Sequence, residues 1–315
     1  MLTITDKIAD ENNVLTVLTI GFFDGVHRGH QYLLKQVVDI ARSRQLKSAV
    51  VTFRQHPHEI IDPKSEIPLL TTLDEKLHLI DRCGIDYAAL LDFTPEISQV
   101  TAFDYMRHTL KEKFGSKVLV IGYDHRFGCK NGDGFEEYRQ YGRLLDIEVI
   151  KAKELPPQNG LKISSTTIRT ALTNGDITLA NQLLGYNYTL RGSVNHGQAI
   201  GRSIGFPTAN ITPCSPNKIV PKDGVYAVCA TIEEKKHYGM LYIGNRPTLH
   251  NLNERRIEVN LFDFNEEIYQ KDITVEFLER IRGEQRFDTL SELKTQLETD
   301  KTTALSICHK RPEKL

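Results

Sequence analysis

The sequence of 315 residues contains few cysteines, no tryptophan and almost no net charge. Its five cysteines are scattered and never form a C-x-x-C pair, which indicates reduced thiols that serve mostly in packing, as in a cytosolic protein. The 40 basic and 41 acidic residues are interspersed and give a net charge of −1. Because no basic patch stands out, we expect no nucleic-acid partner.

Long apolar runs are also missing from the sequence. No run approaches the ~18 residues of a membrane span, and Asp6, Asp10 and Glu11 stand where a signal peptide would be basic. We therefore expect a cytoplasmic protein with no membrane partner. The chain also lacks the G-x-x-x-x-G-K-[ST] string of a P-loop and the H-R-D loop of protein kinases, which argues against both of those mechanisms.

The order of predicted elements divides the chain in two, as its length alone would suggest. Up to about residue 185, strands and helices alternate, which is the pattern of a parallel sheet covered on both faces. Beyond that point, short alternating runs separated by Gly, Pro and Asn favour an antiparallel sandwich or barrel, followed by a terminal helix. We expect an α/β domain over residues 1–185 and an all-β domain over residues 186–315.

The predicted strands follow the apolar runs of the sequence. In the first half they are residues 14–20, 48–53, 87–91 and 118–121, and in the second half 189–194, 225–232, 237–243, 257–264 and 268–277. Thr72 and Glu75 have the spacing of a capping box that opens a helix, and Thr101 can cap another. Helical spacing over residues 290–297 predicts the terminal helix.

The most informative motif is Gly-Phe-Phe-Asp-Gly-Val-His-Arg-Gly-His, residues 21–30, which separates a buried strand from a helical pattern. A helix N-terminus offers unpaired N–H groups and partial positive charge, so it suits phosphate oxygens. Gly25 and Gly29 let the backbone approach a ligand closely, while His27 and His30 share one helical face where both can donate to it. The segment therefore predicts a triphosphate site.

Two alternative roles for His27 and His30 stay open. A catalytic zinc requires three protein ligands, and His56 and His58 are the only other nearby cluster. A pair of surface histidines is the commonest meaning of His-x-Gly-His alone. The surrounding residues are more specific, and residues 21–30 resemble the signature of the α/β nucleotidyltransferase superfamily, which transfers a nucleotidyl group from a triphosphate to an acceptor.

Two further stretches carry phosphate-binding chemistry in the first half. Ser165, Thr166 and Arg169 give hydroxyls and a guanidinium at another helix N-terminus, although a plain helix cap with a solvated arginine accounts for the motif when it stands alone. Asp124 and Arg126 follow a predicted strand and can be aimed at substrate. Ligands of open α/β sheets bind at the carboxyl ends of strands, so the loops 21–30, 52–58 and 122–128 are expected to converge.

Nucleotidyl transfer asks little covalent chemistry of the protein. An acceptor oxygen attacks the α-phosphorus in line and pyrophosphate leaves, so catalysis consists of positioning and charge neutralisation. We expect His27 and His30 to donate to the α- and β-phosphoryl oxygens and Arg169 to the leaving pyrophosphate, with Mg²⁺ bridging the phosphates.

The strongest motif of the second half is Gly-Arg-Ser-Ile-Gly-Phe-Pro-Thr-Ala-Asn, residues 201–210. Its glycines allow a loop to wrap over a nucleotide, and Thr208 and Asn210 alternate along an extended segment, which places two hard oxygen ligands on one side for Mg²⁺. In residues 257–261 the apolar side chains occupy one strand face and leave Glu258 and Asn260 on the other. For Glu266, Glu267 and Glu276, a solvated glutamate on an outer face is the better interpretation.

Together these motifs resemble the bacterial bifunctional riboflavin kinase/FAD synthetase family over almost the whole chain. The resemblance implies an N-terminal, doubly wound, Rossmann-like domain that adenylates FMN, and a C-terminal six-stranded antiparallel β-barrel that phosphorylates riboflavin and carries a terminal helix. It implies the Mg²⁺ ligands at Thr208 and Asn210 and the general base at Glu258. The chain departs from the family pattern at Phe22, at His125 and at residues 198–200.

A carboxylate at position 258 can accept the proton of the terminal ribityl hydroxyl as it attacks the γ-phosphate. Arg282 is expected to hold flavin or nucleotide, with a solvated arginine as the alternative. The residues expected to contact nucleotide or flavin are Gly21, Phe23, Asp24, Gly29, Asp124, Arg126, Ser165, Thr166, Gly201, Arg202, Gly205, Pro207, Asn260 and Arg282.

We therefore expect an enzyme that makes FMN and then FAD, with ATP, riboflavin and FMN as substrates and Mg²⁺ as cofactor. One alternative is a cytidylyl- or adenylyltransferase with a single function and a β-domain that only binds; residues 201–210 together with Glu258 argue against it. The other is a flavin sensor without catalysis, against which His27, His30 and Asn210 argue. The sequence leaves self-association open.

Overall fold

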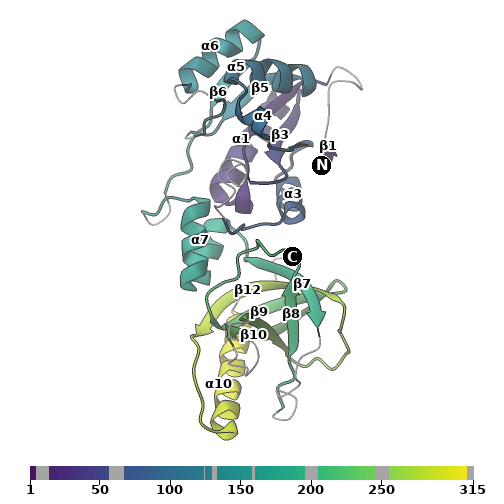
Figure 1. Ribbon diagram of the computed structural model, residues 1–315, viewed down its shortest axis with the longest axis vertical. Helices are drawn as coiled ribbons and strands as arrows, with labels where there is room; N and C mark the ends of the chain where they lie inside the picture. The colour runs from purple at the N-terminus through teal and green to yellow at the C-terminus, as the bar shows by residue number, and fades with distance from the viewer. Residues whose placement is uncertain are drawn as a thin grey trace. The chain divides into compact units, whose positions relative to one another are not determined.

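The computed structural model describes residues 1–4, 14–56, 67–123, 125–129, 133–157, 160–195, 205–245 and 255–310. They form two compact units, Met1–Ser164 and Ser165–Leu315 (Figure 1). The division falls before residue 185 because helices α7 (Ser165–Asn174) and α8 (Ile177–Leu184) pack on each other, and α8 packs on strand β12 of the second unit.

A parallel sheet forms the centre of the first unit. Among the described residues it has six strands in the order β1-β4-β3-β2-β5-β6, and every neighbouring pair is parallel. The strands are β1 (Leu2–Ile4), β2 (Thr16–Ile20), β3 (Lys47–Phe53), β4 (Tyr87–Leu91), β5 (Ser116–Ile121) and β6 (Glu148–Lys151). The sequence predicted the four inner strands and missed the two edges.

Helices cover both faces of this sheet, which confirms the doubly wound arrangement. The helices are η1 (Asp24–Val26), α1 (Arg28–Ser43), α3 (Leu73–Arg82), α4 (Pro95–Ser98), α5 (Ala102–Asp104), η2 (Tyr105–Lys113) and α6 (Phe135–Leu145). Alternate strand residues point to opposite faces: Val17 packs with α1 and α3, while Leu18 packs with η2 and α6. The predicted capping box is present, since Thr72 and Glu75 each donate a backbone N–H to the other's side chain.

The strand order reverses at β2 and β5. From β2 the chain proceeds to β3 and β4 on one side of the sheet, and it returns to β5 and β6 on the other. Ligands of open α/β sheets bind where such a reversal leaves a crevice outside the carboxyl ends of the strands. In this sheet that crevice lies between the segment after Ile20 and the segment after Ile121.

The second unit contains a closed antiparallel barrel of six strands among the described residues, in the order β10-β11-β8-β7-β12-β9. The strands are β7 (Thr189–Asn195), β8 (Ala209–Pro213), β9 (Gly224–Ile232), β10 (Lys235–Asn245), β11 (Arg255–Leu261) and β12 (Asp272–Arg282). This confirms the predicted barrel. The terminal helix α10 (Leu290–His309) is longer than expected and buries Ala304 and Cys308 against the barrel strands (Figure 1).

Candidate functional site

His27 lies at the N-cap of α1, one position before the helix in which the sequence placed it. Its extended backbone (φ −64°, ψ 170°) leads into α1, and its Nδ1 accepts a hydrogen bond from the backbone N–H of His30 at 3.3 Å. An imidazole nitrogen that accepts a hydrogen bond carries no proton, so the proton of the neutral ring is on Nε2. His27 therefore offers its Nε2–H as a donor to a ligand.

His30 stacks on His27 in the first turn of α1. The ring centroids are 3.7 Å apart with an angle of 15° between the planes, and Phe23 meets the His30 ring edge-on at 5.1 Å. Burial lowers the pKa of His30 well below its ordinary value, and the neighbouring His27, His125 and Lys76 lower it further. His30 is thus neutral near pH 7, and its buried Nδ1 has no hydrogen-bond partner among the described residues. A phosphate oxygen is a partner that this nitrogen can take.

The turn that carries the histidines is held by Asp24. Its buried carboxylate accepts hydrogen bonds from the backbone N–H groups of Leu70 and Thr71 at 3.0 to 3.1 Å and from the Thr71 hydroxyl at 3.2 Å. Phe23 and Val26 adopt positive φ values of 57° and 35°, which cost energy for residues with a Cβ and need support from their surroundings. Asp24 supplies that support, and its predicted contact with nucleotide stays a prediction.

The two glycines that flank this turn have a packing role. A Cβ on Gly29 would lie 3.2 Å from the His27 ring, and one on Gly21 would lie 3.0 Å from the Phe23 ring. Side chains at these positions would displace the rings that form the site. Close approach of the backbone to a ligand, which the sequence suggested for Gly29, stays a prediction.

The loop after β5 brings a third imidazole, His125, near His30. The next residue, Arg126, is exposed, while Phe127 stacks on Tyr138 at 4.4 Å and donates its backbone N–H to the Tyr138 hydroxyl at 3.0 Å. Asp124 lies outside the described residues. The predicted meeting of the segments after β2 and β5 is therefore present, and the contacts of Asp124 and Arg126 with substrate stay predictions.

Two other predicted features of the first half have different outcomes. Ser165, Thr166 and Arg169 lie on α7, which belongs to the second unit, so their role beside the histidines stays a prediction. His56 packs edge-on against Phe22 at 4.4 Å. Among the residues that the structure describes, no three His, Cys, Asp or Glu side chains gather as a metal site would need, and His58 lies outside that part of the chain.

Lys76 is a functional candidate that the sequence analysis missed. It lies on α3, only 2% exposed, and its Nζ donates to the Phe53 carbonyl at the end of β3. The same Nζ lies 4.0 Å from the centre of the Phe22 ring. In the sequence it is one more charged residue of an amphipathic helix, so nothing signals its burial.

In the second unit the structure brings the predicted metal ligands and the predicted base together. Asn210 on β8 pairs in register with Glu258 on β11. The hydroxyl of Thr208, which lies just before β8, donates a hydrogen bond to Glu258 Oε2 at 3.3 Å. Asn260, two residues along the same strand, donates its amide to the Pro207 carbonyl at 2.7 Å. Five predicted site residues, Pro207 among them, therefore form one contiguous cluster.

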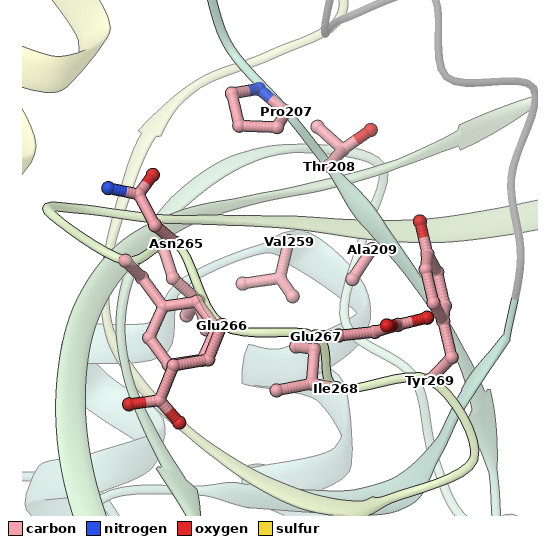
Figure 2. A pocket seen from close by; sticks show the side chains of 11 residues that line it. Pro207, Thr208, Ala209, Val259, Asn265, Glu266, Glu267, Ile268 and Tyr269 are labelled. Carbon is pink, nitrogen blue, oxygen red and sulfur yellow. The ribbon is translucent and has the colours of Figure 1, made fainter.

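A cavity of about 500 Å³ opens beside Thr208, which is within the range that holds a nucleotide or cofactor. It is lined by residues 207–209, by Val259 and Leu261, and by residues 264–269 (Figure 2). The last segment includes Glu266, Glu267 and Tyr269, which the sequence analysis did not place at the site. The only feature of the sequence that could have indicated this segment is the pair of aromatic residues, Phe264 and Tyr269, on either side of the two glutamates. Gly201 and Arg202 lie outside the described residues, and Gly205 is exposed with φ +86°.

Arg282 is engaged with the terminal helix. Its Nε and one terminal nitrogen donate to the Asp300 carboxylate at 2.8 to 3.0 Å, and its other terminal nitrogen donates to the Gly283 carbonyl at 3.0 Å. The Asp300 side chain is only 1% exposed and also accepts from Gln296. This bidentate pair fixes α10 to the end of β12. The predicted contact of Arg282 with flavin or nucleotide stays a prediction.

Replacing Asp300 with Asn is expected to destabilise the second unit by about 2–4 kcal/mol, because it leaves the mostly buried Arg282 without its counter-charge. Urea unfolding followed by circular dichroism measures the change. Glu298→Gln, an exposed site on the same helix, is the matched control and should leave the transition in place. Equal midpoints for the two variants would show that the pair does not stabilise the helix.

Comparison with known proteins identifies the family. The FAD synthetase family model matches residues 9–167, and the riboflavin kinase model matches residues 184–308. The bifunctional riboflavin kinase/FMN adenylyltransferase of Escherichia coli (strain K12) is 37% identical over 91% of each chain, and that of Bacillus subtilis (strain 168) is 36% identical over 96% of each. The chain belongs to this family.

A solved structure supports the same architecture. A crystal structure described as a macrolide-efflux protein from Streptococcus pneumoniae is 34% identical and superposes with a TM-score of 0.86, over 96% of this chain and 99% of that one. Within the described residues, we find no helix with the length and apolar character needed to cross a membrane. Membership in the bifunctional riboflavin kinase/FMN adenylyltransferase family confirms the resemblance and the two enzyme classes predicted from the sequence.

Proposed function

We propose that the barrel transfers the γ-phosphate of ATP to riboflavin, and that the α/β unit then joins FMN to the adenylyl group of a second ATP and releases pyrophosphate. We assign adenylylation to residues 1–185 and the kinase to residues 186–315. The ranges matched by the two family models, which end at residue 167 and begin at residue 184, support this division. The substrates are small molecules, so the proposal needs neither nucleic acid nor a membrane.

The observation that carries the kinase half is the contact between Thr208 and Glu258. A carboxylate oxygen at this place accepts the proton of the terminal ribityl hydroxyl. At the same time the ribityl oxygen forms a bond to the γ-phosphorus, and ADP leaves. The cavity beside Thr208 is lined by Ala209, Val259 and Leu261, which alternate along the strands with Asn210, Glu258 and Asn260, so the proposal does not place the reacting atoms inside it.

The residues around Glu258 also fit a magnesium ion. A threonine hydroxyl and an asparagine amide oxygen are hard oxygen donors, and these two residues lie two positions apart at the start of β8, beside a carboxylate. Thr208 and Asn210 would hold Mg²⁺, which neutralises charge on the phosphates when it is bound.

The adenylyltransferase half depends on donors at the start of α1. His27 offers Nε2–H, and neutral His30 offers a second ring nitrogen, next to the backbone N–H groups of the helix N-terminus. These groups bind the oxygens of the α-phosphate as the FMN phosphate attacks it, and Arg169 binds the leaving pyrophosphate. No side chain forms a covalent bond in this step.

The protein should convert riboflavin with ATP and Mg²⁺ to FMN and then to FAD, as measured by chromatography of the products over time. EDTA is expected to stop FMN formation and added Mg²⁺ to restore it, because hard oxygen ligands hold the ion weakly enough for a chelator to remove it. FAD from supplied FMN without any FMN from riboflavin would indicate a transferase with a single function. Binding of riboflavin without either product would indicate a flavin sensor.

A further inference from the structure

A buried ammonium group lies beside the proposed triphosphate site and has no role in the proposed mechanism. Lys76 Nζ joins three segments at the carboxyl edge of the sheet: α3, which carries it, the end of β3 through the Phe53 carbonyl at 2.8 Å, and the turn after β2 through the Phe22 ring at 4.0 Å. The turn is the one that continues into His27 and His30. Lys76 therefore contacts the segment that carries the proposed phosphate donors.

The charged and titratable groups around Lys76 come from every element packed against it. Asp24 on η1 attracts the ammonium group of Lys76, and the positive charge of Lys76 lowers the pKa of His30 on α1. His56, after β3, packs on the Phe22 ring, and Glu75 on the same helix accepts the Thr72 backbone N–H. Because Asp24 also accepts hydrogen bonds from Leu70 and Thr71, its negative charge is shared among several donors.

A lysine at this position is costly for the fold alone. Burying an ammonium group costs free energy unless it is fully compensated, whereas an apolar side chain of similar length would fill the same space without that cost. The cost shows in the pKa of Lys76, which burial lowers to about 8 despite the attraction of Asp24. A triphosphate bound at the start of α1 would add negative charge to that of Asp24.

We propose that Lys76 is a positioning residue for FMN adenylylation, which holds the turn of residues 22–30 against the end of β3 and adds a fixed positive charge beside the triphosphate. The inference rests on the proposed adenylylation in this unit. It explains why a buried cation accompanies His27 and the neutral His30: the imidazoles donate hydrogen bonds, and Lys76 supplies the charge.

A pH dependence follows from this role. A bound anion favours the protonated lysine, so protonation of Lys76 in turn favours ATP binding. As the pH rises through about 8, the free protein loses the ammonium proton, and kcat/KM for ATP in FMN adenylylation should fall. The fall should appear mainly in KM, because charge lost from the free enzyme weakens binding before chemistry.

The test compares wild type, Lys76→Met and Lys76→Arg by FAD formation from supplied FMN and ATP, from about pH 6.5 to about pH 9.5. Wild type should lose activity through pH 8, and Lys76→Arg, which cannot lose its proton in this range, should not. Lys76→Met should be lower by about tenfold near neutral pH and nearly flat, so that the wild-type curve converges on it at high pH. Arg82→Met, an exposed change on the same helix, should follow wild type.

Thermal unfolding of the same variants, followed by circular dichroism, is the control for folding of the first unit, and their riboflavin kinase activity should stay unchanged because it belongs to the other unit. If Lys76→Arg does not fold, the convergence of the wild-type and Lys76→Met pH curves at high pH still tests the role of Lys76. Equal activity of Lys76→Met and wild type near neutral pH, or the same alkaline fall in wild type and Lys76→Met, would overturn the role of Lys76. Wild type that makes no FAD at any pH would instead refute the proposed function.

Discussion

Replacing His27 with Asn and His30 with Ala together is expected to lower FAD formation from FMN by about 10²–10³-fold, because in the proposed mechanism each ring donates to charge that develops on the α-phosphate. FMN formation from riboflavin should continue at the wild-type rate. The choice of Asn at position 27 matters, since His27 caps α1 through Nδ1 and an asparagine oxygen can replace that acceptor. The measurement is chromatography of the products from FMN and ATP, and separately from riboflavin and ATP.

The matched control is His78→Asn with His108→Ala, two exposed histidines in the same unit. It makes the same two substitutions, His to Asn and His to Ala, and should leave both activities intact. Loss of FMN and FAD together in a folded double variant at positions 27 and 30 would contradict separate sites. Full FAD formation by that variant would remove the histidines from the mechanism.

Replacing Glu258 with Gln should abolish riboflavin phosphorylation, with an expected loss of about 10²–10⁴-fold, the usual contribution of a general base. The amide keeps the size of the side chain and an acceptor oxygen for the Thr208 hydroxyl, so the strand pairing of β8 and β11 should persist. The loss should fall on kcat, since proton removal occurs in the transition state. Supplied FMN should still be converted to FAD.

Glu279→Gln, an exposed change on β12, is the control for this experiment. Both of its activities should equal those of wild type. A Glu258→Gln protein that phosphorylates riboflavin normally would make Glu258 a structural partner of Thr208 and leave the kinase without its base.

Sequence patterns predicted the parts of the fold that depend on local composition. The inner strands of the first unit are continuous apolar runs, and a strand buried on both faces needs such a run. The edge strands β1 and β6 are only three and four residues long and carry polar residues, so no periodicity marks them. Strand β8 was predicted only as an extended segment around Thr208 and Asn210, because Pro213 and the polar residues of the strand resemble a turn.

The candidate site was predicted where its residues are close in the sequence. His27 and His30 are three positions apart, and Thr208 and Asn210 are two apart, so spacing alone placed each pair on one side of its element. Contacts across the chain were not accessible in this way. Neither the pairing of Arg282 with Asp300 nor the burial of Lys76 against Phe22 and Phe53 leaves a mark in the local pattern.

The capping of α1 by His27 shows the same limit on a smaller scale. Spacing put both histidines in the first turn of a helix, but the extended backbone of His27 ends the preceding turn instead. Only the structure shows that its Nδ1 accepts the capping hydrogen bond and that the ring proton is therefore on Nε2.

The central claim is that two independent sites act in sequence on one flavin, and mixing two disabled proteins tests it directly. Glu258→Gln and the double variant at His27 and His30 are each incubated with riboflavin, ATP and Mg²⁺, alone and in equal amounts together. We expect no FAD from either protein alone and clear FAD formation from the mixture, because FMN made by one protein diffuses to the intact adenylylation site of the other. A mixture that accumulates FMN and makes no FAD, although Glu258→Gln converts supplied FMN, would contradict the account.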